Sequence, residues 1–493
     1  MSEEAEKQAR IEAFVQGKVP VTLHKGKLIV LVGSWVIFIL IGIIALIDLY
    51  GPQAATIAWI TAMIAAELWI PILIFIIIAA GTAIGIVLLI LRLLRNHAYG
   101  LLKWSIIIQT ALIWVLAIVI IVLTGFHWGS IFPLIMGIAS TVLAILYFTI
   151  WKMRLELAAG ILGLTGQVTH EEKELLVPGI LKVFFIGILS AFGLIISLDI
   201  IAYTVPTAGA EWFHFVPVGI FYFGLFFYLY INIYFFNAII YAITYIWYRK
   251  KDPKFHDGLA IATYQLPDIA VFAVFSAVIK FVRMLLRIAA LKSKSKSGWS
   301  GGGGFRLADG ILGTVWMYVN YFTLPSIVVE DVPTTTAIKR SVHRLFDNWV
   351  DVLLKEWGVG SVFGTLQLLI VLLFALGGGL LGFVITVVMF PAAQFFDWIL
   401  IMVIIGVILF ILVSMIVSKP LLGLFNDVYL TFLFGFVIDK ESNFKYENNL
   451  PKELMDKLQE WFKSHPMVLR CGKCFGKVPE GVTSCPKCKA PYP

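Results

Sequence analysis

The sequence predicts an all-α, polytopic helical membrane protein of about ten spans, with both termini in the cytoplasm and a small C-terminal zinc ribbon. Three observations predict this class. Of 493 residues, 60% are hydrophobic and 14% are charged, whereas soluble domains carry about 25% charged residues. Several apolar runs reach the roughly 18 residues that cross a bilayer, and they lack the alternation of barrel strands. All four cysteines lie in the last 23 residues, 471–493.

The predicted spans fall into two membrane units. Residues 1–27 are predicted as a cytoplasmic N-terminal segment, and residues 28–164 as a unit of four spans. Residues 165–178 are predicted as a cytoplasmic linker, and residues 179–440 as a second membrane domain. Residues 441–470 are expected to form a cytoplasmic linker helix that leads to the cysteine-bearing tail. The expected spans are residues 28–49, 68–92, 104–124, 131–151, 179–203, 217–247, 268–291, 307–329, 360–388 and 398–418.

Lysine and arginine are unevenly distributed among the predicted loops. They collect near residues 92–103, 152–173 and 249–254, and the intervening loops of the first six spans contain none. Because cytoplasmic loops carry an excess of basic residues, the basic loops and both termini are predicted to be cytoplasmic. The protein is thus expected in the cell membrane. The net charge of +8 is explained by contact with lipid head groups, and no nucleic-acid partner is expected.

Two parts of the chain allow alternative predictions. Residues 268–291 and 307–329 are joined by the basic linker "KSKSKSGWSGGGGF", so they either both cross the membrane or both enter it and return. Residues 421–438 are expected to form an interfacial or re-entrant continuation of the last span. Asn426 and Asp427 would be costly in a further span.

The cysteines Cys471, Cys474, Cys485 and Cys488 follow the pattern CxxC–x10–CxxC. Two such knuckles can present four thiolates to one tetrahedral metal ion at about 2.3 Å, and the tail resembles short zinc ribbons. The prediction is a structural zinc ion in residues 471–493; disulfides, idle thiols and iron are the alternatives. A four-cysteine site has no open coordination position, so it is expected to bind a partner rather than to catalyse. Reduced thiols suit the cytoplasm.

The sixth predicted span has one unusually polar face. Tyr230, Tyr234, Asn237, Tyr241 and Tyr245 fall close to one side of a helix. An asparagine in hydrocarbon needs a partner, and tyrosine hydroxyls three or four residues away are expected to supply it. This face is either the lining of a polar path or a helix-packing face held by interhelical hydrogen bonds.

Residues 334–357 have apolar side chains at helical spacing and basic ones on the other face. They are predicted to form an amphipathic helix on the cytoplasmic surface, with packing against the spans as the alternative. Lys339, Arg340 and Arg344 are expected to contact lipid head groups or the acidic pair that precedes the helix.

Three stretches carry a resemblance to a known type of protein. They are "YFFNAIIYA" (234–242), "DPKFHDGLAIA" (252–262) and "LPSIVVEDVPTTTAIKRSVHRL" (324–345). With them, residues 180–440 resemble an uncharacterised family of prokaryotic polytopic membrane proteins, a domain of unknown function. The resemblance implies a membrane architecture and no particular activity.

The sequence contains neither a glycine-rich phosphate loop nor an HExxH motif, and we expect no enzyme; a lipid-modifying enzyme ranks last. The acids Asp48, Glu67, Asp199 and Asp309 all lie near span ends, which argues against ion-coupled transport. The expected function is therefore a non-enzymatic scaffold or adaptor that engages a protein partner at the cytoplasmic face through the zinc ribbon. The alternative is a transporter or channel, with the ribbon as a regulatory or assembly module.

Overall fold

The computed structural model describes most of the chain, and its described part is almost entirely helical. The described residues are 3–50, 69–124, 128–204, 212–297, 303–347, 359–389, 395–442, 445–456, 469–470 and 477–478. The helices are α1 (Glu3–Val15), α2 (Lys25–Tyr50), α4 (Trp69–Thr124), α5 (Trp128–Phe148), α6 (Lys152–Glu171), η2 (Lys173–Leu175), α7 (Leu176–Thr204), η3 (Trp212–Phe215), α8 (Val216–Tyr248), α9 (Phe255–Tyr264), α10 (Leu266–Ser297), α11 (Gly303–Val319), α12 (Thr323–Glu330), α13 (Thr334–Asp347), α15 (Gly360–Met389) and α16 (Phe395–Glu441). The strands are β1 (Leu469–Arg470) and β2 (Lys477–Val478).

The helices identify a multi-pass membrane protein. Within the described residues, eight helices are long and apolar enough to cross a bilayer, or up to nine if the bent pair α5–α6 counts as one span. Large apolar side chains point outward along them, such as Leu40 (52% exposed), Val122 (76%) and Leu376 (68%). Such surfaces are stable in lipid and not in water. The predicted helical membrane class is confirmed.

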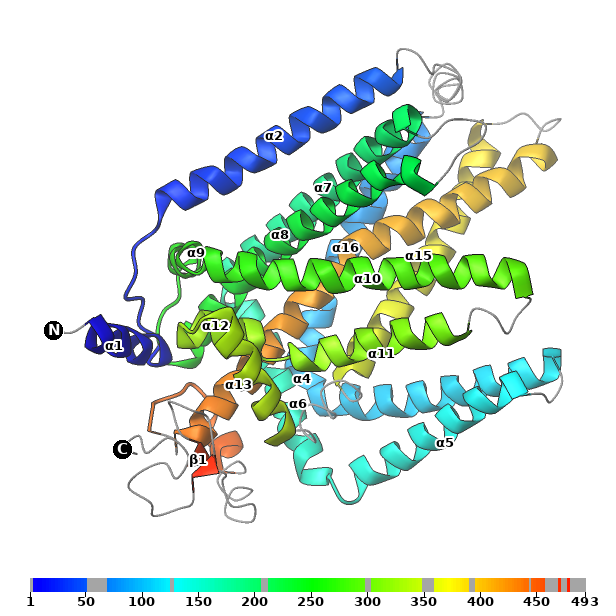
Figure 1. Ribbon diagram of the computed structural model, residues 1–493. Coiled ribbons are helices and arrows are strands. Elements are labelled where there is room, and N and C mark those ends of the chain that lie inside the picture. The colour runs from blue at the N-terminus through cyan, green and yellow to red at the C-terminus, as the bar shows by residue number, and fades with distance from the viewer. Residues whose placement is uncertain are drawn as a thin grey trace.

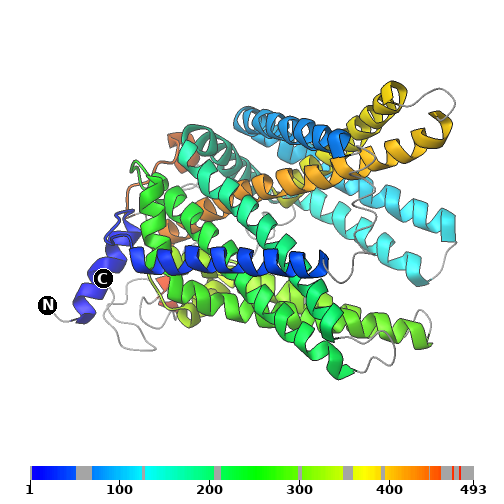
Figure 2. The same ribbon diagram turned by 90° about the horizontal axis from the view of Figure 1, so that it is seen from above.

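The bundle has two distinct ends (Figures 1 and 2). Helices α1, α9, α12 and α13 and strand β1 lie at one end, which we call the terminal end. Helices α2, α7 and α10 finish at the opposite end, which we call the far end. Helices α10 and α11 lie side by side and run between the two ends. Helix α11 ends at Val319, and α12 begins at Thr323, so the segment predicted at residues 307–329 is divided between two helices. The run of α10 and α11 between the two ends is what the first alternative, with both segments crossing, requires.

The connection predicted at residues 165–178 is not an open linker. Helix α6 continues to Glu171 and buries Thr165 and Gly166, and a Cβ at Gly166 would lie 2.9 Å from the backbone nitrogen of Arg95 in α4. The N-terminal unit also packs against the second domain. Trp35 of α2 donates a hydrogen bond to Asn232 of α8, and α4 packs against α15 and α16. The described helices therefore form one bundle.

The end predicted for the last span at Lys419-Pro420 is wrong. Helix α16 is a single helix of 47 residues. Its part from Leu422 to Glu441 is the most buried of the candidate spans, since 89% of its apolar stretch lies inside the protein. Helices α4, α6, α7, α8 and α15 all pack against α16. Residues 421–438 are therefore a central helix of the bundle rather than an interfacial or re-entrant segment, because neighbouring helices supply their polar partners.

The tail is described only in short pieces. Residues 445–456 return to the terminal end, where the Asn449 N–H donates to the Tyr248 carbonyl at 2.7 Å. Strands β1 and β2 pair antiparallel, Leu469 with Val478 and Arg470 with Lys477. The four cysteines lie outside the described residues.

Candidate functional site: a polar pocket in the bundle

A largely buried ion pair joins α7 to α16 within the bundle. Lys182 of α7 lies 3.0 Å from Asp427 of α16, Nζ to Oδ2, and the two side chains are 13% and 10% exposed. Ionisable groups inside a membrane bundle are costly unless they are paired, and they commonly mark functional sites. This pair is therefore the first component of the candidate site.

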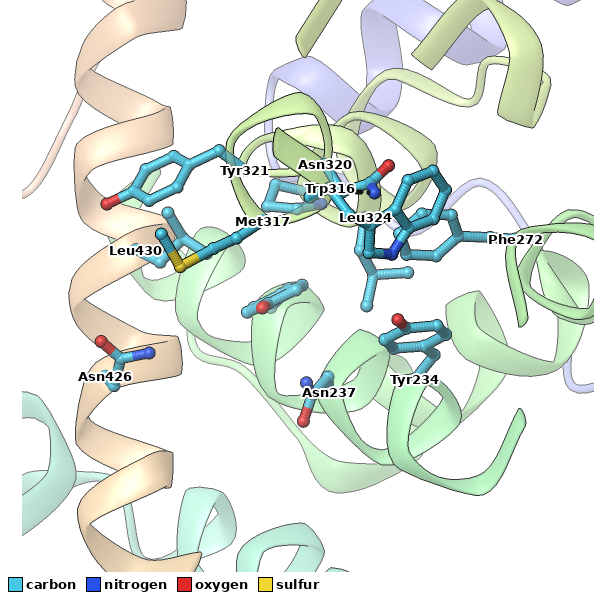
Figure 3. Close-up of a pocket in the computed structure, with 12 residues that line it drawn as sticks. Tyr234, Asn237, Phe272, Trp316, Met317, Asn320, Tyr321, Leu324, Asn426 and Leu430 are labelled. Carbon is cyan, nitrogen blue, oxygen red and sulfur yellow. Dashed lines mark hydrogen bonds between the residues drawn. The ribbon is translucent and has the colours of Figure 1, made fainter. Parts of the chain in front are cut away.

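Lys182 also fixes the orientation of Asn237 on α8. Its ammonium donates to Asn237 Oδ1 at 2.6 Å. Since an ammonium has only donors, the oxygen of the amide must face Lys182, and the nitrogen must face away. Asn237 is 8% exposed, and its Nδ2 has no partner among the described residues. Figure 3 shows the nitrogen directed away from the oxygen and into the space between the helices.

That space is a pocket of about 350 Å³ between α8, α10, α11, α12 and α16. Its wall is largely aromatic, with three asparagine amides (Figure 3). The volume is in the range of small-molecule pockets. The lining residues are Tyr234, Asn237, Tyr241, Phe272, Trp316, Met317, Asn320, Tyr321, Leu324, Pro325, Asn426 and Leu430.

The tyrosines of the wall are held by residues other than Asn237. Tyr234 shares a hydrogen bond of 2.7 Å with Ser276 of α10, and Tyr241 donates to Asp427 at 3.4 Å. The expectation that tyrosine hydroxyls would partner Asn237 is wrong. Lys182 takes this role because it reaches across from a neighbouring helix.

Only part of the predicted polar face meets at the pocket. Tyr234, Asn237 and Tyr241 line it, whereas Tyr230 stacks on Tyr234 with ring centroids 5.5 Å apart and is not among the lining residues. Tyr245 lies toward the terminal end of α8, where its hydroxyl donates to the carbonyl of Val15 in α1 at 2.9 Å.

Three polar residues of the site are not on the predicted face. Lys182 lies three residues inside the fifth predicted span, where a lysine near a span end is ordinary, so only its ion pair with α16 marks it. Asn426 was recognised as costly in lipid, although not as part of a pocket. Asn320 gave no signal, because it lies near the end of a helix where polar residues are common.

A second buried charge cluster lies at the terminal end. Arg344 of α13 is paired with Glu330 at 2.6 Å and with Glu441 at 2.6 Å, and its side chain is 1% exposed. Burial alone would lower the pKa of Arg344, but the two carboxylates more than offset this and raise the pKa. The guanidinium therefore stays charged and ties α13 to α12 and α16.

This cluster decides between the two contacts expected for the basic residues of the surface helix, because Arg340 and Arg344 pair with Glu330. Arg344 is buried, and Arg340 pairs with Glu330 at 2.7 Å, so both contact the acids that precede or face the helix. Lys339 alone of the three predicted residues is exposed. The described part of the helix ends at Asp347 and packs against α10, α11 and α12.

A third cluster joins α8 to the end of α16. Arg249 contacts Asp439 at 2.5 Å with both side chains at most 1% exposed, and it donates to the Tyr245 hydroxyl at 2.7 Å. Tyr248 and Asn448 also donate to Asp439, at 2.6 and 2.8 Å. The Asp439 carboxylate thus accepts hydrogen bonds from three residues. This arrangement indicates a structural role that holds the helices together.

In the part of the chain that the structure describes, no group of His, Cys, Asp and Glu is arranged to hold a metal ion. Residues 216–442 match a family of unknown function (DUF6159). No curated protein matches the chain.

The family match begins at the first residue of α8 and ends one residue after α16. It therefore includes every residue that lines the pocket, as well as Asp427, but not Lys182. The predicted resemblance of residues 180–440 to an uncharacterised family agrees with this match. The N-terminal helices and the cysteine tail lie outside it.

Proposed function

We propose that the protein is a transporter or channel that binds a small polar solute in the pocket between α8, α11, α12 and α16. The proposal depends on the side-chain amide of Asn237. Its oxygen accepts a hydrogen bond from Lys182, and its nitrogen faces the pocket and has no partner among the described residues. A solute with an acceptor atom could accept a hydrogen bond from this amide nitrogen inside the pocket.

The ion pair between Lys182 and Asp427 favours a transporter or channel over the scaffold expected from the sequence. Transport was disfavoured because acids appeared only near span ends. Lys182 and Asp427 supply an intramembrane pair beside the pocket, as is common along transport pathways. Because the pair is neutral as a whole and the wall is aromatic, the favoured solute is uncharged, small and rich in hydrogen-bond acceptors.

The pocket has a binding role in this proposal and no catalytic one. Its lining residues include no serine, cysteine or histidine. The aromatic rings would cover the apolar side of a solute, as Tyr234 and Phe272 already stack on each other with centroids 4.6 Å apart.

The test is solute flux into proteoliposomes that contain the full chain, with small amides and polyols as probes. Asn237→Asp keeps the size of the side chain and an oxygen for Lys182, but it removes the Nδ2 donor. It should abolish the flux of any solute that the native protein passes. Tyr222→Phe is the matched control, since Tyr222 lies on the same helix outside the pocket and donates to Ser197 at 3.3 Å. Equal flux through native and Asn237→Asp protein would overturn the proposal, as would the absence of flux for every probe.

A second candidate, the scaffold or adaptor, is favoured by the register of the tail. Strand β1 ends at Arg470, and β2 begins at Lys477, so the hairpin brackets the first CxxC knuckle, Cys471 and Cys474. We propose that the hairpin supports a structural zinc ion bound by these cysteines with Cys485 and Cys488, and that the tail holds a protein partner at the cytoplasmic face.

Metal analysis of the purified protein tests the zinc site. One zinc ion per chain is expected, and Cys471→Ser with Cys474→Ser should remove it. A native protein that carries no metal would contradict this site. The adaptor function itself would be wrong if protein that lacks residues 471–493 captured the same neighbours as the full chain.

A further inference from the structure

Three cations follow one face of α10 as it approaches the far end. Lys280, Arg283 and Arg287 are three and four residues apart, which places them on one side of the helix; we call them the basic face. Arg283 Nε lies 2.7 Å from Asp309 Oδ1 of α11, and Arg287 Nε lies 2.8 Å from Asp309 Oδ2. A single carboxylate thus faces three cations.

Most of the hydrogen-bonding capacity of the basic face is unused. Each arginine contacts Asp309 through Nε only, so both terminal nitrogens of each guanidinium have no partner among the described residues. Lys280 also has no hydrogen-bond partner among the described residues. Asp309 is 13% exposed, whereas Arg283 and Arg287 are 27% and 57% exposed. The carboxylate of Asp309 is therefore more covered than either guanidinium, and Arg287 is the more exposed of the two arginines.

Among the described residues, the two helices that pack most extensively on α10, α8 and α11, contribute a single acid, Asp309. Helix α8, which packs against α10, contains no charged residue between Val216 and Tyr248. Further along the hairpin, Lys292 and Arg306 are exposed and add positive charge. Apart from Asp309, α11 has no acid from Gly303 to Val319.

The basic face lies among side chains that face lipid. Val282, Leu285 and Ile288 of α10 are 38%, 48% and 44% exposed, and α10 is one of the candidate spans. Unneutralised cations in such a surface are costly, and they reach toward the head groups.

The guanidinium of Arg283 packs against Gly313 of α11. A Cβ at Gly313 of α11 would overlap its guanidinium, so the absence of a side chain there lets the group lie flat against α11. The planar fork of an arginine held in this way matches the oxygens of a phosphate group.

We propose that the basic face binds the phosphate of an anionic lipid head group in the leaflet at the far end of the bundle. The lipid phosphate would accept hydrogen bonds from the terminal nitrogens of Arg283 and Arg287 and pair with Lys280. Acyl chains would lie over the apolar side chains between the cations. A free phosphate ion has the same head-group chemistry, and the experiment separates the two sources.

The experiment is native mass spectrometry of the full chain in detergent, with phosphatidylglycerol or phosphatidylcholine added. We expect the native protein to retain phosphatidylglycerol at least about tenfold better than phosphatidylcholine. Arg287→Gln, at a position that is more than half exposed and tolerant of change, should reduce this preference, and Arg283→Gln with Arg287→Gln should abolish it. Lys339→Gln, which removes an exposed cation at the terminal end, is the control and should retain the native preference.

The variant Asp309→Asn tests whether Arg283 and Arg287 bind lipid or serve only in the ion pair with Asp309. It removes the negative charge that competes with the phosphate for both arginines, so retention of phosphatidylglycerol should rise or stay equal; a loss would overturn the proposal. Equal retention by native and Arg287→Gln, Arg283→Gln proteins would also overturn it. Displacement of the lipid by millimolar inorganic phosphate would assign the site to free phosphate and refute the lipid source, whereas no displacement supports the lipid.

Discussion

Replacement of Arg344 by methionine removes the charge that joins α12, α13 and α16. Arg344 is 1% exposed and contacts Glu330 and Glu441, each at 2.6 Å. Loss of one partner of a buried ion pair costs about 3–5 kcal/mol, because the other charge stays buried without compensation. Glu441 is 22% exposed and can turn to solvent, and Glu330 keeps Arg340 at 2.7 Å. The free energy of unfolding should therefore fall by about 3 kcal/mol, at the lower limit of that range.

The assay is a denaturant titration of the purified protein in detergent, with helical content as the signal. Lys339→Met, an exposed position on the same helix, should change the free energy of unfolding by less than about 0.5 kcal/mol. An Arg344→Met protein within about 1 kcal/mol of the native protein would show that the cluster does not hold these helices together.

Two further predictions concern helix packing and topology. Gly382 of α15 faces the carbonyl oxygen of Met402 in α16 so closely that a Cβ would overlap it, so Gly382→Ala should destabilise the protein by about 1–3 kcal/mol. Gly364→Ala has open space around it and should be neutral or stabilising; equal effects in thermal unfolding would contradict the close contact. In a background without the native cysteines, Gly303→Cys at the start of α11 should react with a membrane-impermeant reagent from the side opposite to Lys250→Cys. Labelling of both from one side would refute the crossing of α10 and α11.

Some features of the site could be found from the chain alone. The lengths of the apolar runs, the polar side of the sixth span and the unusual Asn426-Asp427 pair are all local properties, and each corresponds to a helix or a pocket residue in the structure. The partner of Asn237 could not be found in this way. It is Lys182, which is 55 residues away, and helical spacing only identifies neighbours on the same helix.

The sequence by itself determined the class of protein, because the width of a bilayer sets the length of an apolar span and composition alone excludes a soluble fold. Only the tertiary structure decided that α16 continues through Pro420 and that Asp427 is acceptable inside the bundle. Both depend on which helices surround α16. A buried carboxylate is stable only where a cation from another helix meets it, and here that cation lies 245 residues away in the chain.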